Sequence, residues 1–551
     1  MRVDASGWKT RLTTDLVLAY TSARKWSGST LAEAARTRAI SDPARTIAIE
    51  GERTLSYAQL LSQARRLHTA MHDLGLQAGD VVSFQLPNWL ETLVINLAAC
   101  IGGYICNPIV PIYRDAEVEF ILRDAKSKLL FVPETFRSID YEPMTARLRA
   151  RLTDLRSVVT VRGSNFHSDS FERFSGASDS SAEAAGEYPD PNTVKLLLYT
   201  SGTTGKPKGV LHSHNTLSSE LAAVASFWKL SESDVILMPS PVTHITGYLY
   251  ALEASAFIGA KIILMDRWDA DEAVRSIMNH EVTFCVGATP FLVELTAAAH
   301  RAGLCLPSLK RFVTGGAPVP PDAIRRANAQ FKNCLAFRVY GSSEVPTVSL
   351  GVDEVSDIER GATTEGRIVN NRVRICDPVT GVALGIGEEG EITVCGPEVM
   401  LGYTDWDQTL AAFDAEGYFH TGDLGKIDDE GYLTITGRQK DLIIRGGENI
   451  SPKEIEDFLH RHPGIREAAV IAIPNARLGE GVCACIIPVS GAEITREAIA
   501  RFLDSQRIAK QKWPERVELM SEFPRTAAGK VRKNLLRETL AAIIASEGTT
   551  R

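Results

Sequence analysis

The chain has 551 residues, of which 44% are hydrophobic and 23% charged, and its formal net charge is −8. At roughly 150 residues per domain, this length predicts about three to four structural units. The ordinary composition excludes collagen-like, coiled-coil and disordered classes and small disulfide scaffolds. Because the balance of charge is weakly acidic, the whole chain has no general attraction for nucleic acid or anionic lipid.

Nine cysteines are scattered along the chain without a CxxC pair. This pattern is typical of buried thiols in a reducing compartment. Residues 1–12 carry charges and lack the apolar core of a signal peptide. The most apolar stretch, residues 93–110, is interrupted by glycines and a proline and falls short of the roughly 20 residues that span a membrane. We therefore expect a cytoplasmic protein with no membrane span.

Apolar runs typical of strands alternate with helical patterns along the first 300 residues. Strands are expected at residues 81–85, 129–132, 261–265 and 283–286, and helices at residues 89–100, 118–122, 269–278 and 290–299. Such alternation predicts an α/β fold whose largely parallel sheets are stacked with helices.

The composition changes at two places. Residues 163–191 are rich in Ser, Ala, Asp and Glu, which predicts a mobile connector. Residues 403–447 are rich in Gly, Asp and aromatic residues, which predicts short hairpins in a small β-barrel-like subdomain. Helices and strands expected at residues 452–461, 468–473, 482–489 and 495–505 then form a small α+β unit. The predicted organisation is a large domain over residues 1–437, a hinge over residues 438–441 and a small mobile domain over residues 442–551.

The most informative segment follows an apolar strand and reads Thr200-Ser201-Gly202-Thr203-Thr204-Gly205-Lys206. Glycines let backbone N–H groups approach phosphate oxygens, the hydroxyls can donate further hydrogen bonds, and the lysine offsets the phosphate charge. Pro207 disfavours the helix that would follow in a Walker A loop. A second strand over residues 209–213 and a helix capped by Asn215 are expected next. The segment predicts a phosphate-binding loop; an ordinary glycine-rich turn is the alternative.

This loop resembles the phosphate-binding signature of the adenylate-forming superfamily, which contains acyl- and aryl-CoA synthetases, adenylation domains and luciferases. Further motifs of the superfamily follow in its order: Gly315-Gly316-Ala317-Pro318, Tyr340-Gly341-Ser342-Ser343-Glu344, Gly390-Glu391-Ile392, Thr421-Gly422-Asp423, residues 437–441, residues 446–450 and Pro524 to Lys530. The resemblance covers about residues 30–540. It implies a ligase that joins a carboxylic acid to coenzyme A through an acyl-adenylate, releasing AMP and pyrophosphate.

The resemblance also implies roles for individual residues. Lys530, His244 and Glu344 are the implied catalytic residues, and Glu344 is also the implied ligand of Mg²⁺. The ATP and AMP site is implied to comprise Thr200, Ser201, Gly202, Thr203, Thr204, Gly205, Lys206, Gly316, Ala317, Tyr340, Gly341, Ser342, Ser343, Asp423 and Arg438. The acyl pocket is implied at His244, Ile245, Thr246, Gly315, Val339 and Gly341, and the CoA passage at Gly446, Gly447, Glu448 and Asn449, with Lys440 as the hinge.

The expected acyl pocket contains no Lys or Arg that could pair a second carboxylate. This composition favours a compact apolar acid, either alicyclic, aromatic or of short to medium chain length, and the cyclohexanecarboxylate-CoA ligase branch is the most similar. His212 and His214 are expected on one strand face in structural roles. The spacing of Pro524 and Lys530 resembles an acetylation pattern, so a lysine acetyltransferase is an expected partner, and a homodimer is considered as well.

Three other functions share these motifs to different degrees. An adenylation enzyme that loads a carrier protein would keep every nucleotide motif, and the thiol acceptor would distinguish it. A luciferase-like oxygenase would consume oxygen. A catalytically inactive scaffold would be expected to lose Lys530, Glu344 or Asp423, all of which are present.

Overall fold

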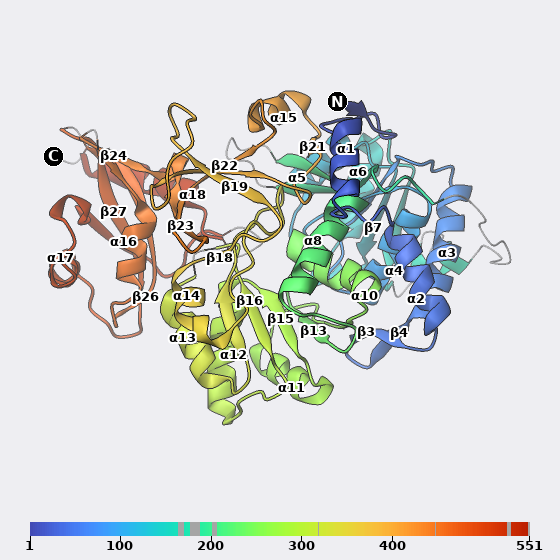
Figure 1. Ribbon diagram of the computed structural model, residues 1–551, viewed down its shortest axis with the longest axis horizontal. Helices are drawn as coiled ribbons and strands as arrows, with labels where there is room; N and C mark the ends of the chain where they lie inside the picture. Colours follow the sequence, from blue (N-terminus) through green and yellow to red (C-terminus); the bar gives the residue numbers. More distant parts are fainter. Residues whose placement is uncertain are drawn as a thin grey trace.

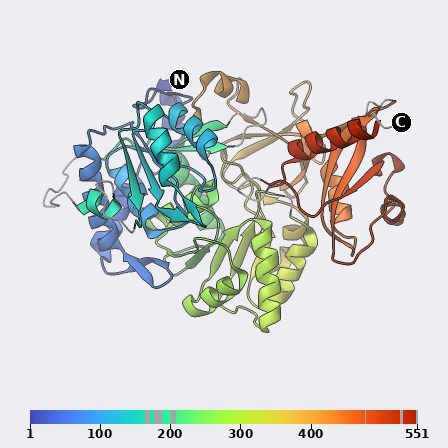
Figure 2. The same ribbon diagram turned by 180° about the vertical axis from the view of Figure 1, so that it is seen from behind.

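The structure is a computed structural model that describes residues 1–163, 170–176, 188–200, 207–317, 319–446, 448–475, 477–525 and 530–548. Figures 1 and 2 show a large body built from the first 440 residues. The C-terminal segment lies at one end of this body, opposite the end that carries α2 (Leu31–Ser41) and α3 (Tyr57–Asp73). The predicted combination of a large and a small unit is confirmed.

Two seven-stranded sheets form the large body. The first has the order β10-β7-β5-β6-β11-β12-β21. Its strands are β10 (Ser157–Val161), β7 (Leu129–Pro133), β5 (Val81–Phe84), β6 (Ile105–Pro108), β11 (Val194–Thr200), β12 (Lys208–Ser213) and β21 (Gly402–Tyr403). The pairs from β10 to β11 are parallel, whereas β11–β12 and β12–β21 are antiparallel.

The second sheet has the order β17-β16-β15-β13-β14-β3-β4 and is parallel except at the β3–β4 hairpin. Its strands are β17 (Leu335–Arg338), β16 (Arg311–Thr314), β15 (Phe284–Gly287), β13 (Val235–Met238), β14 (Lys261–Leu264), β3 (Thr46–Glu50) and β4 (Arg53–Ser56). Parallel strands that are buried on both faces read as continuous apolar runs, which is why the sequence pattern located β14 and β15.

Helices fill three layers around these sheets. The largest buried cluster lies between the two sheets and contains α2, α3, α4 (Leu90–Ile101), α8 (His214–Phe227) and a π-helix, Tyr248–Glu253. The outer face of the first sheet is covered by α5 (Asp115–Asp124) and α6 (Glu142–Arg151), and that of the second by α11 (Ala270–His280), α12 (Thr289–Ala302) and α13 (Pro321–Gln330). The remaining helices of this body are α1 (Thr14–Ser22), α7 (Phe171–Gly176), α9 (Ile245–Gly247), α10 (Ala254–Phe257), α14 (Ile358–Thr363) and α15 (Trp406–Ala412).

A five-stranded antiparallel sheet corresponds to the predicted barrel-like unit. Its order is β18-β23-β22-β20-β19, with β18 (Gly366–Arg367), β23 (Tyr432–Arg438), β22 (Phe419–Ile427), β20 (Gly390–Cys395) and β19 (Arg372–Cys376). A 3₁₀ turn, Gln439–Asp441, follows β23 and leads into the C-terminal unit. This turn falls where the sequence predicts the hinge.

The C-terminal unit contains its own five-stranded sheet. Four strands have the order β25-β24-β27-β26, and β28 pairs parallel to β27. Its elements are β24 (Ile443–Arg445), β25 (Glu448–Ile450), α16 (Pro452–Leu459), β26 (Ile465–Asn475), β27 (Gly479–Pro488), α17 (Arg496–Ser505), β28 (Arg516–Leu519) and α18 (Lys533–Gly548). Apolar side chains of α16, α17, β26 and β27 form its own core, which supports an α+β unit.

The structure corrects four details of the sequence reading. Ser213, not Asn215, caps α8, because its hydroxyl accepts the Thr216 amide. His214 is therefore helical and does not share a strand face with His212. The helix α7 lies within the predicted connector, of which residues 164–169 and 177–187 are outside the described part. Cys305 is exposed, whereas the other eight cysteines are buried thiols.

No helix in the described part of the chain is long and apolar enough to cross a membrane.

Candidate active site

The predicted site residues gather beyond the carboxyl ends of strands in the second sheet. His244 follows β13, Gly315 follows β16, and Val339 and Tyr340 follow β17. In open α/β sheets ligands bind at this edge, because the loops that leave parallel strands converge there. The five-stranded sheet supplies Asp423 from β22 and Arg438 from β23, which are opposite each other in register.

Asp423 joins two of the predicted nucleotide-binding residues. Its carboxylate accepts the Tyr340 hydroxyl at 2.7 Å and the Nε of Arg438 at 2.7 Å. The carboxylate beside Arg438 raises the pKa of that guanidinium, and burial raises the pKa of Tyr340. Asp423 is 7% exposed and Tyr340 6%, so this polar group lies in a largely dehydrated wall beside the tip of β17.

Lys530 reaches this wall from the C-terminal unit. Burial lowers the pKa of its ammonium, and the positive charge of Arg438 lowers it further, whereas Asp423 and Glu344 act in the opposite direction. The charged side chains that act on this ammonium all belong to the large body. A lysine that is more than 100 residues beyond Asp423 in the sequence is thus brought to the same place by the packing of the small unit.

Glu344 follows the β17 loop and contacts the first sheet. Its Oε1 accepts the Tyr403 hydroxyl at 3.0 Å, and its backbone carbonyl accepts the Met400 amide at 2.8 Å. The ammonium of Lys208 lies 4.9 Å from the centroid of the Tyr403 ring. Among the described residues, no donor bonds the second carboxylate oxygen of Glu344. Such a carboxylate, close to Tyr403 and Lys208, fits Mg²⁺, which is held by few protein oxygens together with phosphates.

His244 begins the helical segment that follows β13. Its backbone carbonyl accepts the Tyr248 amide at 2.8 Å, and its own amide donates to Pro241 at 2.9 Å. Burial, and secondarily the charge of Lys530, lowers the pKa of the ring to about 4. The imidazole is therefore neutral near pH 7. A Cβ on Gly247 would lie 2.0 Å from the Pro241 carbonyl oxygen, so only glycine fits this tight return of the chain.

The glycines of the loops after β16 and β17 allow close approach of neighbouring backbone segments. A Cβ on Gly315 would lie 2.5 Å from the Val339 carbonyl oxygen, and one on Gly341 would lie 1.9 Å from the Pro346 carbonyl oxygen. Gly316 has a φ of +76°, a conformation that favours glycine. Ala317 follows Gly316 in the β16 loop and Ser342 and Ser343 follow Gly341 in the β17 loop. Ser342 closes its turn by accepting the Val345 amide at 3.2 Å.

Other predicted residues are placed differently or lie outside the described part. Residues 201–206 and Gly447 are outside it, whereas Thr200 ends β11 opposite Lys208. Gly446, Glu448 and Asn449 lie in the β24–β25 hairpin. Gly446 donates to Leu478 and Glu448 accepts from Gln511, so the contacts of this hairpin that the structure records are within the C-terminal unit. Ile245 is buried and Thr246 partly exposed in α9, after His244.

Three site contacts were not predicted from the sequence. Tyr403 supports Glu344, and the ring of His212 bonds the Ser343 carbonyl at 2.7 Å. Asn88 holds the turn before His244, since its amide donates to the carbonyls of Met238 and Ser240 and its Oδ1 accepts the Val242 amide. Only Tyr403, next to Gly402 in an apolar run, carries a local signal that could have drawn attention to it.

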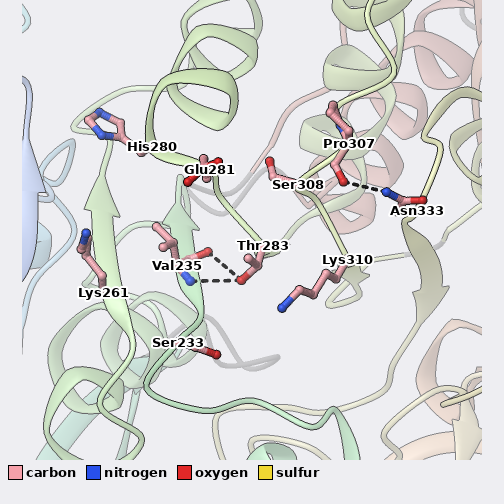
Figure 3. A pocket seen from close by; sticks show the side chains of 10 residues that line it. All are labelled: Ser233, Val235, Lys261, His280, Glu281, Thr283, Pro307, Ser308, Lys310 and Asn333. Atoms are coloured by element: carbon pink, nitrogen blue, oxygen red, sulfur yellow. Dashed lines mark hydrogen bonds between the residues drawn. The ribbon is translucent and has the colours of Figure 1, made fainter.

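A surface pocket lies at the opposite edge of the second sheet. It has a volume of about 450 Å³ and is lined by the side chains that Figure 3 labels, among them Lys261, Thr283 and Lys310. Thr283 bonds the backbone of Val235, and Asn333 donates to the Pro307 carbonyl at 2.8 Å. Because this cavity faces the amino ends of the strands and contains no predicted site residue, it is separate from the candidate active site.

Comparisons with known proteins agree with this geometry. The family described as "AMP-binding enzyme" matches residues 35–404, and the family described as "AMP-binding enzyme C-terminal domain" matches residues 454–530. The chain belongs to the AMP-binding enzyme family. The match covers most of the chain and includes the loops that carry His244, Gly315, Tyr340 and Glu344.

Individual relatives cover nearly the whole chain. The chain is 32% identical over 527 residues to a medium-chain fatty-acid–CoA ligase of Escherichia coli, covering 95% of this chain and 92% of the relative. It is 33% identical to an indoleacetate–CoA ligase of Aromatoleum aromaticum, covering 91% and 96%. The ATP-bound MatB of Rhodopseudomonas palustris superposes with a TM-score of 0.83 at 30% identity, covering 94% and 100%.

A structure of the Bacillus subtilis o-succinylbenzoate CoA synthetase with its acyl-adenylate intermediate superposes with a TM-score of 0.78 at 25% identity, covering 92% of this chain and 97% of that one. The predicted reaction class, ATP-dependent acid–thiol ligation through an acyl-adenylate, is confirmed, and the carrier-protein alternative is not favoured.

Proposed function

We propose that the protein activates a compact apolar carboxylic acid with ATP and transfers the acyl group to coenzyme A. The observation that carries this proposal is the buried Asp423 carboxylate, which accepts hydrogen bonds from Tyr340 and Arg438. The charges of Asp423, Glu344 and Arg438 act on Lys530 from the C-terminal unit. This arrangement fits the first half-reaction. A carboxylate attacks an anionic phosphate poorly, and an ammonium in a dehydrated site stabilises the charge that builds up on the phosphoryl oxygens.

The other site residues support the nucleotide in this scheme. Tyr340 offers an aromatic face to the adenine, and Asp423 accepts the ribose hydroxyls while Arg438 holds it in place. Thr200 and residues 201–206 are assigned to the phosphates, with Gly316, Ala317, Ser342 and Ser343 beside the adenine and the triphosphate. Glu344 would hold Mg²⁺ through its second oxygen, where the ion would neutralise phosphate charge.

The second half-reaction requires different groups around the same carbonyl. We assign residues 1–437 to one domain, residues 438–441 to the hinge and residues 442–551 to the domain that rotates. Lys440, in the 3₁₀ turn, is the proposed pivot. Rotation would withdraw Lys530 and bring in Gly446, Gly447, Glu448 and Asn449, and the glycines would leave a passage for the pantetheine arm. Such domain closure gates chemistry in many enzymes.

The class of carboxylic acid is inferred from the residues of the expected acyl pocket around His244. The ring of His244 is neutral at pH 7, Ile245 is 3% exposed, and Gly315, Val339 and Gly341 add no charge. An apolar pocket of this kind favours alicyclic, aromatic or short to medium-chain acids over dicarboxylic acids. The relatives named for medium-chain fatty acids and indoleacetate support this choice.

The test measures each half-reaction with purified protein. Pyrophosphate exchange into ATP is followed across a panel of alicyclic, aromatic and C4–C12 acids, and thioester formation is compared with CoA and with a phosphopantetheinylated carrier protein. We expect exchange with apolar acids and transfer to CoA. The variant Lys530→Ala should lose exchange by at least about 100-fold and still convert preformed acyl-adenylate to acyl-CoA. Equal loss of both halves contradicts the role of Lys530, and no exchange with any acid contradicts the proposed function.

Three further proposals accompany this function. The buried free thiols support a reducing, cytoplasmic location. A homodimer is proposed as the assembled state, to be tested by light scattering. Acetylation of Lys530 by a lysine acetyltransferase would remove the charge that adenylation needs, so a fully acetylated sample should be inactive in the same exchange assay.

A further inference from the structure

A buried ion pair lies between the two large sheets. Lys195 of β11 contacts Glu253, the last residue of the π-helix, and their side chains are 1% and 0% exposed. The ammonium also lies 5.6 Å from the centroid of the Tyr248 ring. Removing two charges from water costs several kcal/mol per ion, and their attraction often does no more than offset this cost. The pair is therefore poor evidence for stability and needs another explanation.

A network of hydrogen bonds fixes this pair from several elements. Asn96 of α4 donates to Glu253 at 3.0 Å, and its Oδ1 accepts the Tyr248 hydroxyl at 2.6 Å and the Cys106 thiol at 3.3 Å. The network thus ties together α4, β6, β11 and the π-helix. Directional hydrogen bonds of this kind fix the relative positions of the four elements. Apolar contacts alone would fix these positions less strictly.

The two charged residues belong to segments that lead to opposite sides of the reaction. Lys195 is on the strand that ends at Thr200 and continues into the phosphate-loop residues 201–206. Glu253 lies inside the continuous helical run of α9, the π-helix and α10, which follows His244, whose carbonyl accepts the Tyr248 amide. π-helical turns are rare in proteins, and those that occur often lie at functional sites. The ion pair is a direct contact between these two segments.

We propose that Lys195 and Glu253 are positioning residues for adenylation. By holding the π-helix against β11, their ion pair sets the position of His244, on the acid side, relative to Thr200, the described end of the strand on the phosphate side. A misplacement of about 1 Å between reacting groups can cost about 100-fold in rate. This inference rests on the proposed function, because it assigns the two ends to the acid and to ATP.

The test uses Lys195→Met, Glu253→Leu and the double variant that carries both changes. Each single variant leaves one buried charge without its partner and should lower the midpoint of thermal unfolding. The double variant removes both charges and should recover that midpoint. Its acid-dependent pyrophosphate exchange should nevertheless fall by at least about tenfold, with a raised KM for the acid and an unchanged KM for ATP. Its conversion of preformed acyl-adenylate to acyl-CoA should be that of the unmodified protein.

Arg162→Met is the matched control. Arg162 forms ion pairs of 2.6 Å and 2.7 Å with Glu50 and Glu91, and Glu91 lies on the same helix as Asn96. This variant should lower the unfolding midpoint without changing either KM, because it leaves β11 and the π-helix in place. A lowered midpoint with a raised acid KM in the control would show that any loss of stability has this effect, and the proposal would be wrong.

The remaining outcomes are also decisive. A double variant with a recovered midpoint and unchanged exchange kinetics means that the pair is structural, which overturns the proposal. If the double variant does not fold, Lys195→Arg keeps the charge and is compared with Lys195→Met; we expect a lower acid KM for Lys195→Arg, and equal values would overturn the proposal. An unmodified protein that exchanges with no acid contradicts the proposed function itself and is recognised before any variant is made.

Discussion

Asp423 connects two other residues of the predicted nucleotide site, Tyr340 and Arg438. It accepts hydrogen bonds from Tyr340 and from Arg438, each at 2.7 Å, and it is 7% exposed. The sequence places the three residues more than 80 positions apart at their extremes, yet each belongs to a recognisable motif. The motifs predicted that these residues share a site, and the structure adds that they bond one another directly.

Replacing Asp423 by Asn should weaken ATP binding selectively. The amide keeps the size of the side chain but leaves the guanidinium of Arg438 without its anion and gives ribose hydroxyls a poorer acceptor. We expect the KM for ATP in pyrophosphate exchange to rise about 10- to 100-fold, equivalent to about 1–3 kcal/mol, with little change in the KM for the acid. Tyr340→Phe, which removes one hydroxyl and keeps the ring, should have a smaller effect. An unchanged KM for ATP in Asp423→Asn would contradict the assignment.

At the scale of elements, the loop after β17 is the part that could be predicted best. Its Gly, Ser and Glu residues identify it by composition, and its shape follows from local rules, such as the Ser342–Val345 turn. The strands expected at residues 81–85, 129–132, 261–265 and 283–286 were also predicted within a few residues, because short apolar runs leave few alternatives. The cap of α8 was misassigned by two residues, because Ser213 and Asn215 are both good N-cap residues and only the backbone angles distinguish them.

Gly341→Ala should distort this loop. The added Cβ would lie 1.9 Å from the Pro346 carbonyl oxygen, so one of the two backbones must move. Forcing atoms into a packed site costs about 1–3 kcal/mol, and we expect a lower unfolding midpoint together with a raised KM for ATP. Gly176→Ala is the control, since its Cβ would meet nothing within 4 Å and its φ is not positive. Equal behaviour of the two variants would show that the close approach at Gly341 is not important.

At the scale of the whole molecule, a buried pair of acids joins the large body to the five-stranded sheet. Glu220 on α8 and Glu398 after β20 are 0% and 1% exposed. Thr347 donates to Glu220, and Asn370 and Asn371 donate to the two oxygens of Glu398. Burial raises the pKa of both carboxyl groups, and the charge of Glu398 raises that of Glu220 further. The other titratable groups that interact with the pair are Tyr250 and Lys25.

This pair predicts a loss of stability as the pH rises. An acid whose pKa is raised on folding keeps its proton longer in the folded chain than in the unfolded chain. Stability therefore falls between the ordinary carboxyl pKa and the raised value, by up to about 1.4 kcal/mol per pH unit for one retained proton. Urea unfolding midpoints measured from about pH 5 to about pH 9 should fall more steeply for the unmodified protein than for Glu220→Gln, which has no proton to lose.

Glu493→Gln is the matched control for this measurement, because Glu493 is exposed in the C-terminal unit. Its midpoints should follow those of the unmodified protein across the range. Slopes that are the same in Glu220→Gln and Glu493→Gln would show that the buried pair does not retain a proton, and the assigned origin of the pH dependence would be wrong.

The sequence by itself determined the α/β class, the order of the motifs and the types of residue in the candidate site. These features depend on periodicity and on short segments, in which the physical constraint and the residues that meet it are close together in the chain. Only the tertiary structure decided which side chains support the site. Tyr403 and Glu344 are 59 residues apart, Lys195 and Glu253 are 58 apart, and Thr347 and Glu220 are 127 apart. No local pattern predicts that such partners meet, because they are far apart in the chain, and it is the packing of the large body that brings them together.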